Sequence, residues 1–190
     1  RRQRQMWIRD SGIPNMELTP EMAAQVGAVF GTVLGSGAIV VTARDYYPPS
    51  RMFKRAFSSG LMSTGVTVID FHAATTPELT FAIKRFGAKA GVQFTVSPYK
   101  ENAVTLKLLN SLGAEISQER LNEIRRMYET RHVVRTLPSR IGWVSYAEYI
   151  HEIYVSSVVG FVDADSIIAH SLSATIDYNF GPADNVIPDL

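Results

Sequence analysis

The sequence predicts an α/β fold, a layered α/β/α sandwich in which helices cover both faces of a mixed, mostly parallel sheet. Three strand–helix alternations within the first half of the chain support this prediction, since parallel strands are joined by helical crossovers. Each predicted strand is a short apolar, β-branched run that ends in a polar loop. Of the 190 residues, 46% are hydrophobic and 19% are charged, so the chain can bury a globular core.

The first helix is predicted by its start signal, the Leu-Thr-Pro-Glu run at residues 18–21. The threonine hydroxyl can accept from first-turn amides, the proline suits the first helical position, and the glutamate complements the helix dipole. Apolar residues then recur at helical spacing until the glycines of residues 35–37 end the helix. Residues 1–18 are expected to be extended or irregular, with Trp7 and Ile8 packing on the core.

The following elements repeat this pattern. Four strands are predicted in the first domain, at residues 38–42, 66–69, 92–96 and 104–109, the last of them at a sheet edge. Helices are predicted after Ser50, Thr75 and Ser117, because serine and threonine cap helix N-termini. Right-handed crossovers place the carboxyl ends of parallel strands at one edge. The loops after the first three of these strands are therefore expected to lie together.

A basic linker at residues 132–142 predicts the boundary between two units. Residues 1–135 are interpreted as the first domain, and residues 136–190 as the linker and the opening, truncated part of a second domain. The second unit is expected to contain an amphipathic helix at residues 146–158, a strand at 173–178 and the start of another helix at 185–190.

Composition excludes several function classes. The chain has no cysteine, which excludes disulfides, thiolate metal sites and cysteine nucleophiles. The net charge of +1 and the lack of a basic–aromatic motif give no support for a nucleic-acid partner. The apolar runs are too short to span a membrane and no signal peptide is visible, so a cytoplasmic location is expected. The four histidines lack metal-ligand spacing, and Asp163 and Asp165 are interpreted as a helix cap.

The strongest candidate for chemistry is the stretch 91–100, a buried-strand run that stops at Ser97 and a proline. A serine at the end of a strand places its hydroxyl at the edge where ligands of open α/β sheets bind, so it could act as a nucleophile or carry a phosphate. Arg44 and Lys107 could offset the phosphate charge. Two alternatives stay open: Ser-Pro is also a common turn start, and Arg44 and Asp45 can form a local ion pair.

Together these stretches resemble the first domain of the α-D-phosphohexomutases, the phosphomannomutase and phosphoglucomutase superfamily. The resemblance covers about residues 6–130, and residues 144–190 resemble the opening of the family's second domain. The matching segments are the helix start at 18–21, the Ala43-Arg44-Asp45 loop with Ser50, the Thr75-Thr76-Pro77 helix start, and the strand 91–97 followed by Lys107.

The resemblance implies a role in sugar-phosphate metabolism, with intramolecular phosphoryl transfer on hexose phosphates through a phosphoserine. Ser97 falls on the phosphorylated serine, and Lys107 on the lysine that assists proton movement or neutralises charge. Arg44, Asp45 and Thr95 are implied to bind phosphate or to support the loop. Mg²⁺ is expected for the full-length family, held through the Ser97 phosphate and a loop beyond this chain. The implied partners are a hexose phosphate and the remaining mutase domains.

The sequence departs from the family pattern at several positions. Pro98-Tyr99-Lys100 replace the His-Asn-Pro that follows the serine, Pro14 stands for an arginine, and Val104 and Thr105 replace an Asn-Gly. These losses weaken the case for phosphoryl transfer, which depends on positioning and charge stabilisation. The divergent pattern is most similar to the mutase-like region of some mannose-1-phosphate guanylyltransferases, where it follows a nucleotidyltransferase domain. The alternative function is therefore non-catalytic assembly or sugar-phosphate sensing in such an enzyme.

Overall fold

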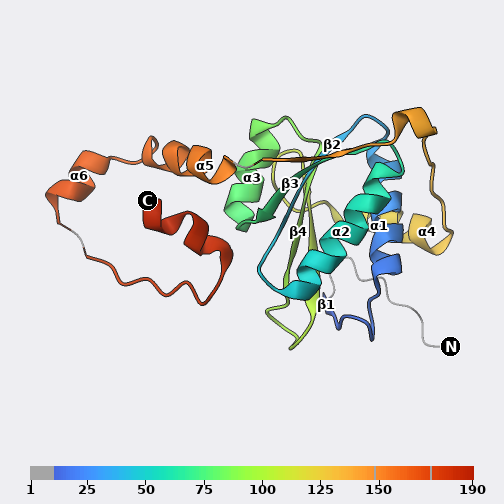
Figure 1. Cartoon of the computed structure of the whole chain (residues 1–190), viewed down its shortest axis with the longest axis horizontal. Coiled ribbons are helices and arrows are strands. Elements are labelled where there is room, and N and C mark those ends of the chain that lie inside the picture. The colour runs from blue at the N-terminus through green and yellow to red at the C-terminus, as the bar shows by residue number, and fades with distance from the viewer. Residues whose placement is uncertain (1–10, 148, 172) are drawn as a thin grey trace.

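The computed structural model describes residues 11–147, 149–171 and 173–190, and a mixed sheet of six strands forms the centre of this part of the chain (Figure 1). The strands are β1 Ser11–Gly12, β2 Ile39–Arg44, β3 Thr67–Ala73, β4 Ala90–Val96, β5 Val104–Asn110 and β6 Val144–Tyr146, in the order β1-β5-β4-β2-β3-β6. Strands β4, β2, β3 and β6 are parallel, and β5 runs antiparallel to its neighbours β4 and β1. The predicted fold class is confirmed, and Trp7 and Ile8 lie outside the described residues.

Helices cover both faces of the sheet (Figure 1). The helices α1 Pro20–Leu34, α2 Pro48–Met62 and α4 Gln118–Glu129 share one apolar layer, and α3 Thr76–Arg85 and α5 Ile150–Val159 belong to the other. In the first layer the rings of Phe30, Phe57 and Phe94 form a chain, with centroid separations of 6.2 and 5.6 Å. These two apolar layers make the sandwich, because each helix buries one stripe against the sheet.

Most helix starts follow the local signals. Thr19 Oγ1 accepts a hydrogen bond from the Met22 amide at 3.4 Å, and Ser117 Oγ accepts one from an amide three residues later at 3.3 Å. Thr75 and Glu78 form a reciprocal capping box. Each cap satisfies an amide that has no partner inside the helix, which stabilises the helix by about 1 kcal/mol. The caps predicted at these three helices are confirmed.

The cap predicted at Ser50 is wrong. Helix α2 begins at Pro48 with Tyr47 at the N-cap, and Ser50 lies inside the first turn with a fully buried side chain. Pro48 and Pro49 occupy the first two helical positions, where a missing amide proton costs nothing, so the helix starts earlier than the serine suggests. Among the described residues the Ser50 hydroxyl has no hydrogen-bond partner.

Helices α1 and α2 approach each other closely through two glycines. A Cβ at Gly27 would lie 2.1 Å from the carbonyl oxygen of Phe57, and a Cβ at Gly60 would lie 2.0 Å from that of Ala24. Real Cβ atoms do not approach backbone this closely, so the two helix backbones pack at a distance that only glycine permits.

The last fifty residues match the sequence predictions only in part. Strand β6 extends the sheet beside β3, α5 begins at Ile150, and Asp163 caps the short helix α6 Ala164–Ala169 as predicted. The strand predicted at 173–178 is wrong, because these residues are irregular and mostly exposed, and within the described part of the chain no strand lies beside them to pair with. Instead of a helix start at 185–190 there are two 3₁₀ turns, η2 Pro182–Asn185 and η3 Ile187–Asp189. The domain boundary near residue 135 stays a prediction.

Candidate functional site at the carboxyl edge of the sheet

The loops after β2, β3 and β4 meet at one edge of the sheet, as parallel strands require. The Ala74 amide donates to the Arg44 carbonyl at 3.0 Å, and the Asp45 amide donates to the Phe94 carbonyl at 3.0 Å. Asp45 Oδ2 accepts from the Val96 amide at 2.5 Å. The loop that follows β2 is therefore bonded to the ends of both neighbouring strands.

Asp45 and Thr95 support this edge through the backbone. The second carboxylate oxygen of Asp45 accepts from the Tyr47 amide at 3.1 Å, so the side chain joins the start of α2 to the end of β4. Thr95 Oγ1 donates to the carbonyl of the next residue, Val96, at 3.3 Å. Neither side chain has a described contact with Ser97.

Arg44 ends β2 as a half-buried cation. Its Nη1 donates to the carbonyl oxygen of Asp45 at 2.7 Å, and among the described residues no ion pair joins the two side chains. Burial lowers the pKa of Arg44, and the nearby charge of Arg51 lowers it further, whereas Asp70 and Asp45 oppose this shift. The guanidinium is therefore partly desolvated and lies within the fields of both arginine and aspartate side chains.

The Ser97 hydroxyl closes a turn. Its Oγ accepts from the amides of Tyr99 at 3.2 Å and Lys100 at 3.1 Å, and it lies 2.5 Å from Ser11 Oγ. Ser11 Oγ in turn lies 2.7 Å from Thr105 Oγ1. Because a hydroxyl has two lone pairs and one proton, the two amides direct the Ser97 proton to Ser11. Only 8% of Ser97 is exposed, and the turn interpretation of this Ser-Pro step is confirmed.

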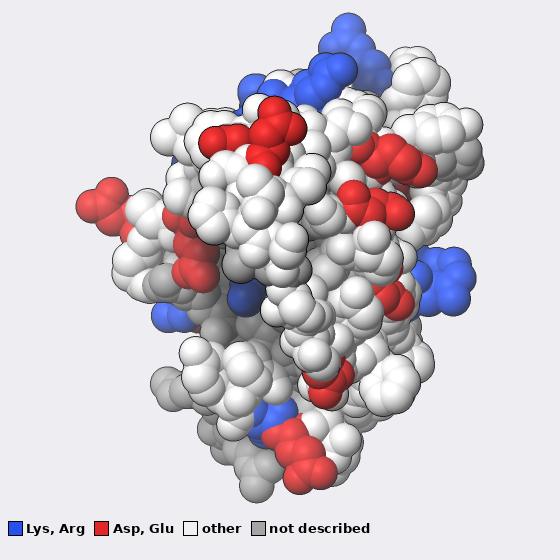
Figure 2. Space-filling model, turned by 90° about the vertical axis from the view of Figure 1, so that its left-hand side faces the viewer, with Lys and Arg blue, Asp and Glu red and all other residues white. Residues whose placement is uncertain are grey.

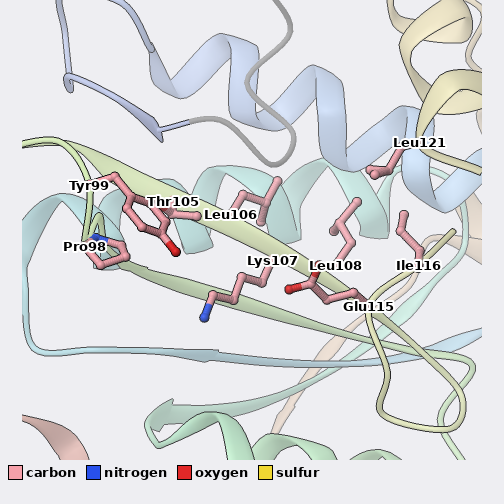
Figure 3. A pocket seen from close by; sticks show the side chains of 9 residues that line it. All are labelled: Pro98, Tyr99, Thr105, Leu106, Lys107, Leu108, Glu115, Ile116 and Leu121. Atoms are coloured by element: carbon pink, nitrogen blue, oxygen red, sulfur yellow. The ribbon is translucent and has the colours of Figure 1, made fainter. Parts of the chain in front are cut away.

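Lys107 faces a different space. It lies on β5 opposite Gln93, and its side chain lines a cavity of about 370 Å³ together with Tyr99, Glu115 and Leu121 (Figure 3). No described contact joins Lys107 to Ser97 or to Arg44. The structure therefore brings Arg44, Asp45 and the end of β4 together, and the grouping of Ser97 with its two cations stays a prediction.

A buried ion pair behind the edge was not predicted from the sequence. Lys54 of α2 contacts Asp70 of β3, and the lysine side chain is only 2% exposed. Burial lowers the pKa of Lys54, and the charge of Asp70 opposes this shift. Asp70 Oδ1 also accepts from the His72 amide at 2.7 Å, which holds His72 at a φ of 56°. No local pattern indicates this pair, because Asp70 lies 16 residues from Lys54 in the sequence.

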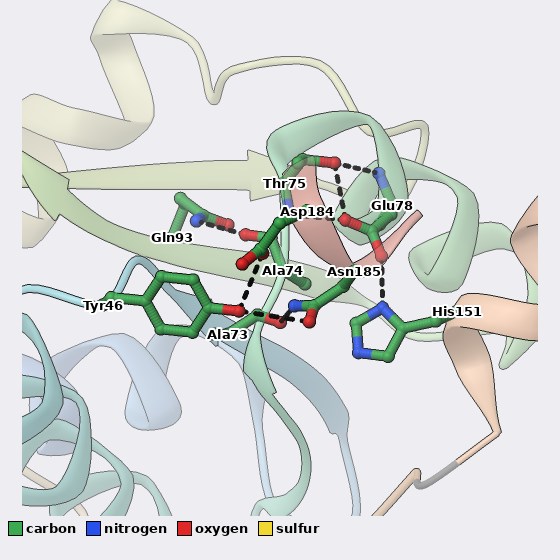
Figure 4. Close-up of polar contacts among 9 residues, drawn as sticks. All are labelled: Tyr46, Ala73, Ala74, Thr75, Glu78, Gln93, His151, Asp184 and Asn185. Atoms are coloured by element: carbon green, nitrogen blue, oxygen red, sulfur yellow. Dashed lines mark hydrogen bonds and ion pairs between the residues drawn. The ribbon is translucent and has the colours of Figure 1, made fainter. Parts of the chain in front are cut away.

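A second polar cluster at the β3–α3 junction was also missed. Glu78 is fully buried and accepts from the Thr75 amide at 2.6 Å and from His151 Nδ1 of α5 at 2.5 Å (Figure 4). The hydrogen bond to Glu78 raises the pKa of His151, although burial opposes the shift. Because His151 lies 73 residues from Glu78, no local pattern could pair them.

The described side chains do not fit a magnesium ion. In the part of the chain that the structure describes, no group of three His, Cys, Asp or Glu side chains comes together. A hard cation needs several oxygen ligands, but Asp45 binds amides, Asp70 binds Lys54, and Ser97 offers only a neutral hydroxyl engaged in a turn.

The chain is similar to known proteins of one family. The family model described as phosphoglucomutase/phosphomannomutase, alpha/beta/alpha domain I, matches residues 9–134. The chain belongs to this phosphohexomutase family. A probable phosphoglucosamine mutase of Pyrococcus furiosus is 34% identical over 178 residues, which cover 94% of this chain and 38% of the relative. A phosphoglucomutase/phosphomannomutase of Thermococcus kodakarensis is 31% identical over 183 residues, covering 94% and 40%.

Solved structures agree with the phosphohexomutase fold. A phosphoglucomutase/phosphomannomutase family protein of Burkholderia thailandensis superposes with a TM-score of 0.71 at 20% identity, over 83% of this chain and 36% of that one. A putative phosphomannomutase of Thermus thermophilus gives 0.69 at 22% identity, over 84% and 36%. This phosphohexomutase-family chain thus spans well under half the length of the relatives it matches. No helix within the described residues is long and apolar enough to cross a bilayer.

Proposed function

We propose that this chain serves sugar-phosphate metabolism as a phosphohexomutase-type first domain that binds a hexose phosphate at the carboxyl edge of its sheet, without carrying a phosphoryl group on Ser97. The hydrogen bonds of the Ser97 hydroxyl support the proposal that this serine carries no phosphoryl group. Both of its lone pairs accept backbone amides, and the residue is only 8% exposed. Attack on phosphorus needs a free lone pair and a group that removes the proton. No described carboxylate, imidazole or amine contacts this hydroxyl.

Binding without transfer is consistent with the charges at the edge. Arg44 uses one described N–H on a carbonyl, which leaves most of its planar fork for phosphate oxygens. Asp45 fixes the loop that carries Arg44, because its carboxylate bonds to Val96 and Tyr47 on either side. In a complete mutase of this family, Mg²⁺ would offset the charge of a phosphoserine. A cytoplasmic location stays a prediction.

The test is incubation of the full-length protein with glucose 1,6-bisphosphate, followed by mass spectrometry of the peptide that contains Ser97. We expect no phosphate on Ser97 above the level in a Ser97→Ala control. We expect Ser97→Ala to unfold more easily by about 1–2 kcal/mol, because the amides of Tyr99 and Lys100 lose their acceptor. Near-stoichiometric phosphorylation of Ser97 would overturn the proposal and restore phosphoryl transfer through a phosphoserine, with Lys107 as the candidate neutralising cation.

A second candidate is a non-catalytic region that packs against a nucleotidyltransferase domain, as in the mannose-1-phosphate guanylyltransferases. The locked Ser97 favours it, and so do large apolar side chains that are exposed beyond residue 140, such as Trp143 at 71% and Phe161 at 92%. The same surface suits the remaining domains of a mutase. Deleting this region from the full-length protein discriminates the two, since unchanged guanylyltransferase activity and assembly would contradict this second candidate.

A further inference from the structure

Two exposed aromatic side chains stack at the carboxyl edge of the sheet. His72 lies near the end of β3, and Tyr146 ends the parallel strand β6. Their rings are almost parallel, with an interplanar angle of 6° and centroids 5.0 Å apart. The His72 side chain is 58% exposed and Tyr146 is 59% exposed. Each ring uses one face on the other, so the pair keeps aromatic surface for a ligand.

The backbone of His72 is strained. Opposite Ala43 of β2, strand β3 has two residues, Phe71 and His72, so a bulge lies here. The φ of His72 is 56°, in the left-handed region that residues other than glycine rarely adopt. The Asp70 carboxylate accepts the His72 amide at 2.7 Å and holds this conformation. Bulges and strained residues are frequent at ligand sites, where they change the direction of a side chain.

Arg44 ends the strand next to this aromatic pair. Ala73, the residue after His72, is the partner of Arg44 in the sheet register, and the following amide, that of Ala74, donates to the Arg44 carbonyl at 3.0 Å. Neighbouring strands of a sheet lie about 4.8 Å apart, so one small ligand can reach two adjacent strand ends. The guanidinium and the aromatic pair can therefore contact the two ends of one sugar phosphate.

The charge distribution determines which end of such a ligand faces Tyr146. Residues 141–190 contain seven Asp and Glu and no Lys or Arg, and Figure 2 shows acidic side chains spread over the face that this part of the chain forms. A phosphate is repelled by these carboxylates and attracted to Arg44, which lies on the other side of β3 from β6. The uncharged end of a sugar phosphate is thus the end that suits the aromatic pair.

We propose that His72 and Tyr146 form a sugar platform, an aromatic surface on which the ring of a hexose phosphate stacks while Arg44 binds its phosphate. This inference rests on the proposed function, since it assigns the sugar end of the same ligand. The faces of a glucose ring carry C–H groups that pack on aromatic rings, whereas its equatorial hydroxyls lie at the rim and stay in water. Small-molecule sites commonly combine aromatic surface with a few polar groups that fix the orientation of the ligand.

Two single variants test the sugar platform. His72→Gly removes one ring and suits the φ of 56°, so this variant should fold at least as stably as the unmodified chain. Tyr146→Thr removes the other ring and keeps a good strand former on β6. Calorimetric titration of the full chain compares glucose 1-phosphate with inorganic phosphate. In each variant the dissociation constant for glucose 1-phosphate should rise about three- to tenfold, and that for inorganic phosphate should change less than about twofold.

Phe161→Thr is the matched control, because this aromatic side chain is 92% exposed and has no described ring contact with the sugar platform. It should leave both dissociation constants unchanged. Saturation-transfer NMR supplies a second readout. Irradiation of aromatic protons should reach the ring protons of glucose 1-phosphate in the unmodified chain and in Phe161→Thr, and much less in the double variant His72→Gly with Tyr146→Thr.

Three outcomes would overturn the sugar platform. Equal affinity for glucose 1-phosphate in the unmodified chain and both platform variants, with binding lost in Arg44→Ala, would remove the platform and leave the proposed function intact. A parallel loss of inorganic phosphate binding in both platform variants would show that the pair acts on the phosphate and not on the sugar ring. Absence of binding of either ligand to the unmodified chain would overturn the proposed function and the platform together.

Discussion

Replacing Asp70 by alanine removes the one described carboxylate that contacts the buried ammonium of Lys54. The lysine side chain is 2% exposed and Asp70 is 12% exposed, so water cannot take over the lost interaction. Removing one partner of a buried ion pair costs about 3–5 kcal/mol, and losing the acceptor of the His72 amide adds about 1 kcal/mol. We therefore expect Asp70→Ala to lose about 4–6 kcal/mol, a large share of the stability of an ordinary domain.

Urea unfolding followed by circular dichroism measures this loss, provided that the slope against denaturant stays constant. The double variant Lys54→Met with Asp70→Ala removes both charges and should be more stable than Asp70→Ala alone. Burial lowers the pKa of Lys54, so in Asp70→Ala the folded state binds the lysine proton less tightly than the unfolded state does. Stability should consequently rise with pH in that variant. The reasoning is refuted if Asp70→Ala costs less than about 1 kcal/mol, or if the double variant is no more stable than the single one.

Three further changes test other parts of the structure. The bond to Glu78 raises the pKa of His151, so this pair stabilises the fold below the ordinary histidine pKa of about 6.5, and the stabilisation is lost as pH rises through the raised pKa. The melting temperature should therefore fall over that pH range. The fall should disappear in His151→Gln and remain in His170→Gln, which changes an exposed histidine. Asp45→Asn should lower the free energy of unfolding in urea by about 1.5–3 kcal/mol, because each carboxylate oxygen accepts one backbone amide and the asparagine side chain has only one oxygen. Equal stability of the variant and the unmodified chain would contradict the role of Asp45 in holding the loop. Gly60→Ala should cost about 1–3 kcal/mol despite its better helix propensity, because the new Cβ would lie 2.0 Å from the Ala24 carbonyl oxygen of α1. Gly160→Ala is the milder control, since its Cβ would come no closer than 3.3 Å to the Ser156 carbonyl oxygen, and it should cost less than Gly60→Ala in urea unfolding.

The features that could be predicted from the sequence are those set by neighbouring residues. The caps at Thr19, Thr75 and Ser117 depend on groups within three or four positions, and each is present as expected. The fold class followed because apolar strands alternating with helices permit few arrangements. The cap predicted at Ser50 is wrong for a reason that is also local. The two prolines before it determine where the helix begins and leave the serine inside the first turn.

The features that could not be predicted join distant residues or depend on pairing partners. Lys54 falls on a helix whose other charged residues are exposed, and only contact with Asp70 explains why this lysine is buried. His151 and Glu78 meet across two helices. The run 173–178 has β-branched and aromatic residues, but strand propensity reflects packing against neighbours, and no strand lies beside it among the described residues.

The loop after β4 is the feature that separates the proposed function from phosphoryl transfer through Ser97. A serine that carries phosphate must keep its oxygen free, and the residues after it must hold the loop by other means. Here Ser97 itself holds the loop, since the amides of Tyr99 and Lys100 both bond to its oxygen. A phosphoryl group on that oxygen would compete with both bonds and would enter a hydroxyl chain that continues to Ser11. In the proposed function, the binding of an anion at this edge then rests on Arg44, which uses one described N–H on the carbonyl of Asp45.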